Sequence, residues 1–202
     1  FVILSSKVSE HVALQDTLEA LEIPCAYFEV ETFSDYLQML EICCDITGQP
    51  ELYQQNGLAV QAQIDDAIAR KEGKPSPKVL LLRAYSTGAK AKGSDNLAGA
   101  ILKDLGCVNI ADIDVSLLED LSMEKIIQED PDYIFVTTMG VSSEAALQSL
   151  AEGIQSNPAW GELTAVKEGR YILLEKELFH YKPNARWGES YEKLAGILYG
   201  EE

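Results

Sequence analysis

Cationic and aromatic side chains gather in two segments of this chain, and each segment follows a run of apolar residues. The first segment comes after Val79–Leu82 and the second after Tyr171–Leu174. Their members are Arg83, Tyr85, Ser86, Lys90 and Lys92 in the first, and His180, Tyr181, Lys182, Arg186 and Trp187 in the second. Such side chains offer charge-assisted hydrogen bonds and stacking surfaces. They predict a site for an anionic ligand with an extended apolar or conjugated surface; for Lys90 and Lys92, ordinary solvated lysines are the alternative.

Two of these residues, His180 and Tyr181, are of the types that serve as axial ligands of haem iron. The chain has only two histidines, His11 and His180, and a lone histidine is more often polar surface. Met139 could act as a second soft ligand or simply pack. We therefore expect no cofactor and no resident metal, with His180 or Tyr181 as an iron ligand only if the bound substrate is haem.

The order of strand and helix patterns predicts an α/β fold with largely parallel strands. Apolar runs predict strands at 1–4, 25–30, 79–82, 108–110, 133–138 and 171–174. Open sheets of this kind bind ligands beyond the carboxyl ends of their strands. Four segments occupy that place: Ser5–Ser9, Arg83–Ser94, Thr137–Ser142 and Glu177–Arg186. The first adds Ser6 and Lys7 to the expected ligand-binding residues, and Ala84–Ser94 is expected to be a loop throughout.

Helical patterns surround these strands. Between Glu51 and Glu72 a single apolar stripe without proline predicts a helix of about 22 residues, roughly 33 Å long, which suits a strut between two lobes. Gly73–Pro77 ends it. Ser34 is placed to cap an earlier helix. Pro183 suits the first turn of a last helix, which carries Trp187, Tyr191, Leu194 and Leu198 on one face.

Composition excludes several classes of partner. The 202 residues include 33 acidic and 16 basic side chains, a net charge of −17, which repels phosphate backbones and makes nucleic acid an unsuitable partner. No apolar run approaches the roughly 20 residues that span a bilayer. The chain opens on the strand-like run Phe1–Leu4, so we expect its natural start to lie upstream. The four cysteines contain no C-x-x-C pair and predict no zinc site.

An enzyme is the alternative class. Glu129, Asp130 and Asp132 form an acidic cluster, and paired carboxylates can perform acid–base chemistry. However, Asp130-Pro131-Asp132 reads as a helix-to-strand turn, where these residue types are favoured for backbone reasons. No nucleophile-elbow, zinc-protease or phosphate-loop motif occurs. We therefore predict a protein that is not an enzyme.

Two segments carry a family resemblance: 122–136, with Ser-x-Glu ahead of Asp-Pro-Asp-Tyr-Ile-Phe-Val, and 157–172, with Asn-Pro-Ala-Trp and Val-Lys-Glu-Gly-Arg-Tyr-Ile. They resemble the C-terminal lobe of the solute-binding proteins that deliver iron-siderophore, haem and cobalamin to ABC importers. The resemblance implies two Rossmann-like lobes with parallel sheets, joined by one long helix, with the ligand between them. It implies a partial N-terminal lobe at 1–48, the connecting helix at 49–73, a C-terminal lobe at 78–178, and a closing loop and helix at 179–202.

The same resemblance implies partners and roles. Glu124 and Glu10 match exposed glutamates that dock on arginines of the membrane permease, whereas from the residues alone they are acids at helix starts, favoured by the helix dipole. Trp160 matches a structural position that packs under the last strand. The expected protein is an extracytoplasmic, lipid-anchored or periplasmic binding component. Ferric siderophore is the favoured ligand because the loops are cationic, with haem or cobalamin as further candidates. The alternatives are a tetrapyrrole metal chelatase of similar architecture and a non-transport ligand sensor.

Overall fold

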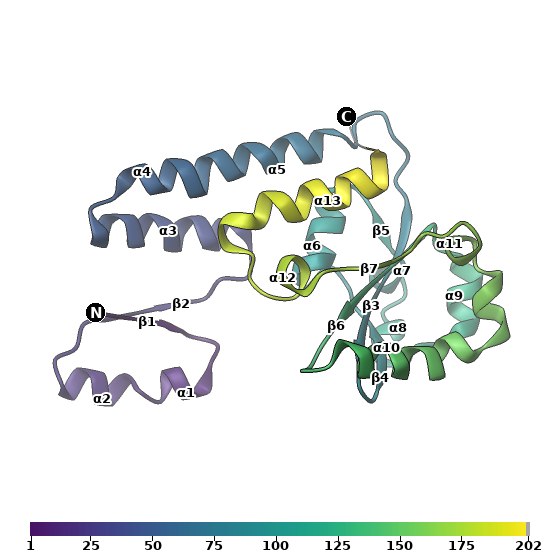
Figure 1. Ribbon diagram of the computed structural model, residues 1–202, viewed down its shortest axis with the longest axis horizontal. Coiled ribbons are helices and arrows are strands. Elements are labelled where there is room, and N and C mark those ends of the chain that lie inside the picture. Colours follow the sequence, from purple (N-terminus) through teal and green to yellow (C-terminus); the bar gives the residue numbers. More distant parts are fainter. Residues whose placement is uncertain (201–202) are drawn as a thin grey trace. The chain divides into compact units, whose positions relative to one another are not determined.

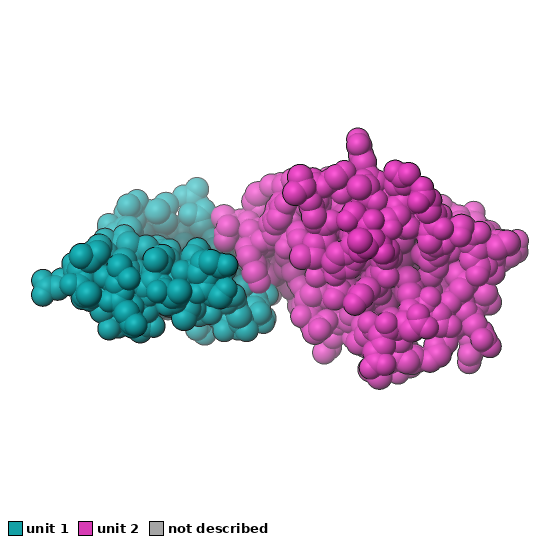
Figure 2. Space-filling model, turned by 90° about the horizontal axis from the view of Figure 1, so that it is seen from below, with its two compact units in different colours: residues 1–57 teal, residues 58–202 magenta. Residues whose placement is uncertain are grey.

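The structure is a computed structural model that describes residues 1–200. It divides into two compact units, residues 1–57 and 58–202 (Figures 1 and 2). Each unit contains its own parallel strands and flanking helices, which confirms the predicted α/β class.

The first unit is built on a two-stranded parallel sheet. Strand β1 pairs with β2 from Val2 opposite Cys25 to Ser5 opposite Phe28. The elements of this unit are β1 (Val2–Ser5), α1 (Ser9–Val12), α2 (Gln15–Ala20), β2 (Cys25–Phe28), α3 (Phe33–Thr47), α4 (Pro50–Tyr53) and the π-helical segment Gln54–Leu58. Phe1, which precedes β1, and Ile3 within β1 are 59% and 54% exposed.

The start of α3 differs from the expectation. Thr32, not Ser34, is its N-cap: the Thr32 hydroxyl accepts from the Asp35 N–H at 3.2 Å, and the Asp35 carboxylate accepts from the Thr32 N–H at 2.8 Å. This reciprocal pair satisfies two backbone donors at once, and a lone Ser34 cap cannot do so. The helix ends at Gly48, whose φ of 65° is the left-handed conformation that glycine adopts without strain.

Residues 50–69 are helical throughout, as α4, the π-helical segment and α5 (Ala59–Ala69). Gly57 lies in the π-helical segment, where an added Cβ would approach Leu37 and Leu40 to 3.1 and 3.2 Å. A larger residue would push these side chains away, so the tight packing explains glycine here.

The second unit holds a five-stranded sheet in the order β4-β3-β6-β7, with β5 also paired to β3. All pairs are parallel except β3 with β4. The strands are β3 (Lys78–Tyr85), β4 (Gly88–Ala91), β5 (Val108–Asn109), β6 (Tyr133–Thr138) and β7 (Tyr171–Leu173). Strand β4 corrects the expectation of a loop at 84–94. Its Gly-Ala-Lys-Ala sequence has low strand propensity, and pairing with the buried strand β3 overrides that preference.

Helices cover both faces of this sheet (Figure 1). They are α6 (Leu97–Asp104), α7 (Ile110–Ile113), α8 (Ser116–Glu119), α9 (Met123–Glu129), α10 (Ser143–Glu152), α11 (Thr164–Lys167), α12 (Lys176–Phe179) and α13 (Trp187–Tyr199), with 3-10 turns at Ile154–Ser156, Pro158–Glu162 and Asn184–Arg186. Side chains alternate along β3. Leu80, Leu82 and Ala84 belong to one core cluster, so Arg83 belongs to the opposite face.

Strand β3 is the centre of the unit, since Val79–Leu82 is fully buried. Burying each such side chain stabilises the fold by roughly 1.5–3 kcal/mol. Helices α5 and α13 pack side by side on one face of the sheet (Figure 1). An ion pair of 2.5 Å between Arg70 and Glu192 joins them, and the Tyr191 hydroxyl donates to Asp104 of α6 at 2.7 Å. The rigid strand ends in Arg83 and Tyr85, which it presents at its carboxyl end.

Candidate ligand-binding site

Arg83 occupies the carboxyl-terminal half of β3, with Thr137 of β6 and Lys90 of β4 as its cross-strand neighbours. Its side chain is half-buried, and its Nε is fully buried without a hydrogen-bond partner among the described residues. A buried donor without a partner destabilises a protein, and more so when the group is charged. Arg83 is therefore a donor that an anionic ligand could satisfy.

His180 lies close enough to Arg83 for the two side chains to interact electrostatically. Burial lowers the pKa of His180 below its ordinary value of 6.5, and the positive charges of Arg83 and Lys176 lower it further. The imidazole is therefore neutral at neutral pH and keeps a lone pair for a metal or a donor. Its Nδ1 is buried without a hydrogen-bond partner in the described part of the chain. Its ring lies 5.4 Å from that of Tyr181, at an angle of 56°.

Further contacts fix this end of the sheet. Lys176 Nζ donates to the carbonyl of Gly140 at 2.8 Å, which ties α12 to the segment after β6. In that segment Met139 is 42% exposed, and its N–H donates to the Ala84 carbonyl at 2.9 Å. Strand ends β3 and β6 and helix α12 thus bring Arg83, Met139 and His180 to one edge. Tyr85, the last residue of β3, is half-buried beside them.

Lys176 is missing from the residues expected from sequence. It stands four residues before His180, on α12. Residues four apart on a helix are neighbours, so this spacing was the signal that could have identified it.

Other predicted residues are engaged elsewhere or buried. Arg186 forms a bidentate pair with Glu189, with Nη2 2.8 Å from Oε2, and this pair, together with Glu175 and Glu177, raises the pKa of Arg186. The guanidinium of Arg186 is therefore already engaged by a neighbouring carboxylate. Trp187 is only 2% exposed, so contact between its ring and a ligand requires the surrounding chain to move. Ser86 and Lys182 are exposed.

In the first unit, Ser6 and Lys7 follow β1 as expected. Lys7 pairs with Glu29 at 2.8 Å and Glu31 at 3.8 Å, and Glu29 is the main cause of its raised pKa. Ser6 is exposed, and its N–H donates to the Phe28 carbonyl at 3.1 Å. The other histidine of the chain has a structural role, because His11 Nδ1 accepts from the Ser5 N–H at 3.0 Å.

The two predicted docking acids are both exposed in the first turn of a helix. Glu10 lies in α1, and a hydrogen bond from its backbone and then one from the Ser9 hydroxyl, at 3.0 Å, lower its pKa. Glu124 lies in α9, and no ion pair involves it in the described residues. Ser122 stands at the N-cap of α9 but makes no side-chain capping bond.

The acidic turn holds the fold together. Asp130 adopts a left-handed φ of 41° and accepts from the N–H and hydroxyl of Thr164 at 2.8 and 2.6 Å, which lowers its pKa. Asp132 accepts from the Lys78 N–H at 2.8 Å. Trp160 is 7% exposed and packs edge-on against Tyr171 of β7, as predicted. These residues are committed to structural contacts.

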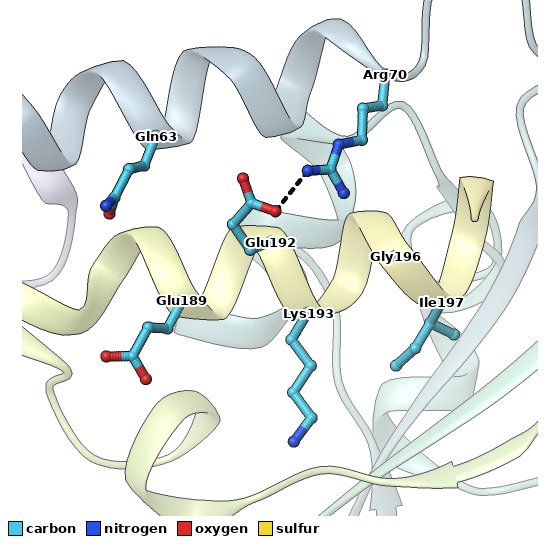
Figure 3. Close-up of a pocket in the computed structure, with 7 residues that line it drawn as sticks. All are labelled: Gln63, Arg70, Glu189, Glu192, Lys193, Gly196 and Ile197. Carbon is cyan, nitrogen blue, oxygen red and sulfur yellow. Dashed lines mark hydrogen bonds and ion pairs between the residues drawn. The ribbon is translucent and has the colours of Figure 1, made fainter. Parts of the chain in front are cut away.

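A cavity of about 850 Å³ opens between α5 and α13 (Figure 3). Figure 3 shows Glu192 directed toward Arg70, whereas Lys193 points away from α5. The charged groups at this cavity pair within the unit: Lys193 contacts Glu175, and Glu189 contacts Arg186. It therefore offers an ionic ligand little unmatched charge. Within residues 1–200, no cluster of three or more metal-binding side chains occurs, and no helix has the length and apolar character to cross a membrane.

Comparison with known proteins gives a consistent result. The periplasmic binding protein family model matches residues 1–178. No curated protein sequence matches the chain significantly. Similar solved structures include the periplasmic haem-binding protein RhuT from Roseiflexus sp. RS-1, with a TM-score of 0.75 and 20% identity over 98% of this chain and 75% of that one. The S. aureus protein IsdE complexed with haem has a TM-score of 0.73 and 15% identity over 98% of this chain and 76% of that one.

A substrate-binding protein of an ABC transporter from Listeria monocytogenes EGD-e has a TM-score of 0.71 and 19% identity, and covers 99% of this chain and 77% of its own. At these identities the likeness shows the fold alone. The family match, however, extends over most of the chain, and both the family and these neighbours are substrate-binding transport proteins. The chain therefore belongs to the periplasmic binding protein family, as an extracytoplasmic substrate-binding protein and not an enzyme.

Proposed function

We propose that this chain is the binding component of an ABC importer and captures an anionic iron chelate at the carboxyl ends of β3 and β6. The observation that carries the proposal is the pairing of a half-buried Arg83, whose Nε lacks a hydrogen-bond partner among the described residues, with a neutral His180. The chain has a net charge of −17, yet neither Arg83 nor Lys176 at this edge forms an ion pair with an acidic side chain among the described residues. A carboxylate or catecholate oxygen would accept from Arg83 in a charge-assisted bond.

Ferric siderophores and haem share this chemistry, because both carry iron and peripheral negative charge. A ferric siderophore already fills the coordination sphere of its iron, so it needs Arg83 but no protein ligand. Haem uses both groups: a propionate pairs with Arg83, while the neutral imidazole of His180 binds iron. The buried Nδ1 of His180, which has no hydrogen-bond partner among the described residues, and the lowered pKa of this histidine favour haem as the second candidate. Cobalamin stays a prediction of the resemblance.

Titration calorimetry of the protein with ferric hydroxamate and catecholate siderophores, haem and cyanocobalamin tests the proposal. We expect one of the iron chelates to bind with micromolar or tighter affinity. His180→Ala separates the two candidates: it removes the haem absorption shift that iron ligation causes, but leaves siderophore affinity within about twofold. Absence of binding by every chelate would overturn the proposed ligand class.

The importer assignment also proposes a permease as partner, with Glu10 and Glu124 as docking contacts. Both are exposed acids in first helical turns, as docking on cationic side chains requires. The division into lobes at 1–48 and 78–178, linked by 49–73 and closed by 179–202, is part of the same proposal, and limited proteolysis tests it. Lipid anchoring stays a prediction, which metabolic labelling with a fatty acid tests.

A further inference from the structure

A second cavity of the larger unit, of about 460 Å³, lies away from Arg83 and His180. The start of β4, the residues around the start of α9, and the end of α10 with its following turns line it. Its apolar lining residues are Ala89, Leu121, Met123, Leu150, Ile154 and Pro158. We propose that this cavity receives an apolar side chain of a partner polypeptide, next to a basic side chain that pairs with Glu124.

The lining favours an apolar occupant. Ala89, Leu121, Met123 and Ile154 are only partly buried, and all four pack against the core cluster of the unit. Leu150, at 1% exposure, forms part of that core. An inserted side chain would extend a core that already exists, and anchors of this kind carry most of the affinity at protein interfaces. The volume of about 460 Å³ has room for one or two side chains and lies in the lower half of the range of ligand pockets, which commonly run from about 300 to 1,000 Å³.

The rim favours a basic neighbour for that apolar side chain. Asp120, Glu124 and Glu152 are exposed, and each is next in sequence to a residue that lines the cavity. In the described part of the chain none of the three takes part in an ion pair. Lys90 is the single basic residue in the same position. The excess of acid would steer a cationic segment toward the cavity and orient it.

This inference rests on the proposed function, because the partner with this chemistry is then an extracytoplasmic loop of the permease. The proposed interface then has two parts: an ion pair at Glu124 and an apolar side chain of the permease inserted into the cavity. Charge sets encounter and register, whereas burial of the anchor slows dissociation.

Stimulation of ATP hydrolysis tests the inference, with the permease–ATPase complex of the same organism reconstituted in lipid nanodiscs. Ser149→Phe places a phenyl ring in the cavity, and we expect the half-saturating protein concentration to rise by roughly tenfold or more. Ala151→Phe is the matched control, because it adds the same ring to an exposed position of α10 that does not line the cavity. We expect this control to stay within about twofold of the wild type.

Two further variants keep the test decisive if Ser149→Phe does not fold. Met123→Ala shortens a lining side chain and should weaken stimulation several-fold. Glu124→Arg should weaken it by roughly tenfold, whereas Glu72→Arg, an equal change of charge at an exposed site in the turn after α5, should not. Chelate affinity should be unchanged in all of them.

The outcomes separate this inference from the proposed function. If the wild type binds a chelate and stimulates the transporter but Ser149→Phe and Met123→Ala have no effect, the cavity inference fails and the importer assignment stands. If Ser149→Phe weakens chelate binding instead, the cavity is a ligand site and the inference is overturned. A wild-type dimer in light scattering that Ser149→Phe dissociates would make a second copy the occupant, which also overturns it. Failure of the wild type to stimulate at all overturns both the inference and the importer assignment.

Discussion

Replacing Arg83 with glutamine removes the positive charge and the two Nη donors, and leaves a shorter, neutral amide whose nitrogen reaches only as far as Nε. In the structure this Nε has no hydrogen-bond partner within residues 1–200, so the substitution breaks no protein contact of that atom. The cost should therefore appear in ligand binding and not in folding. A hydrogen bond to a charged group contributes about 1.5–3 kcal/mol. We expect the Kd for the iron chelate to rise by about 10- to 150-fold.

The same substitution has a second, independent readout. The positive charge of Arg83 is one of the causes that lower the pKa of His180, after burial. Removing it should raise that pKa toward 6.5, although burial and Lys176 still hold it below. Titration of the histidine resonances by NMR measures this shift, and the His11 signal serves as an internal comparison.

Arg70→Gln is the matched control, because it makes the same chemical change at the α5–α13 ion pair. We expect it to lower stability slightly and to leave chelate affinity unchanged. An Arg83→Gln protein with wild-type affinity and an unshifted His180 would refute the reasoning, since it would mean that Arg83 neither faces the ligand nor interacts with the imidazole.

Three other predictions address stability. Gly99→Ala would place a Cβ 2.0 Å from the Gly93 carbonyl oxygen, so we expect the free energy of unfolding to fall by roughly 3 kcal/mol. Gly161→Ala is the control, because nothing lies within 4 Å of the added Cβ, and it should change the free energy of unfolding by less than about 0.5 kcal/mol. Equal melting temperatures for the two variants would contradict this prediction. In the folded state the pKa of His180 lies below 6.5, so as the pH falls the unfolded chain takes up the proton before the folded chain does. The folded protein should therefore lose stability as the pH falls below 6.5. Urea unfolding at pH 5 and 7 checks this, and His180→Gln should show a smaller difference between the two pH values. Thr164→Val deletes the 2.6 Å hydrogen bond from the Thr164 hydroxyl to Asp130 but keeps the bond from the Thr164 N–H. It should lower the free energy of unfolding in urea by about 1 kcal/mol and raise the pKa of Asp130. An unchanged pKa of Asp130 would show that the hydroxyl does not lower it.

Local patterns predicted much of the second unit because its elements depend on short stretches of sequence. The continuous apolar run Val79–Leu82 specifies a strand buried on both faces, and the structure buries it completely. The acidic turn was correctly read as structural, because Asp and Pro favour such turns for local reasons. The Asn-Pro-Ala-Trp segment likewise places Trp160 against the last strand.

Where the sequence misled, a non-local contact or a competing local pattern decided the outcome. Strand β4 forms although its residues are weak strand formers, because β3 offers it a free edge. The stripe that predicted the last helix also implied that Trp187 faces inward, and the structure buries it. The Thr32–Asp35 capping box gave a stronger helix start than Ser34 alone.

The sequence by itself determined the α/β class and the family, since both depend on patterns and motifs read along the chain. It also predicted the edge of the sheet where cations gather. Only the tertiary structure decided which of those cations remain available. Folding brings Glu29 to Lys7, and Arg186 pairs with Glu189 three residues along the chain, whereas Arg83 and His180, far apart in sequence, lie near each other. The reason is physical: charge pairing depends on distances of a few ångströms between side chains, and those distances are set by how strands and helices pack, not by residue type.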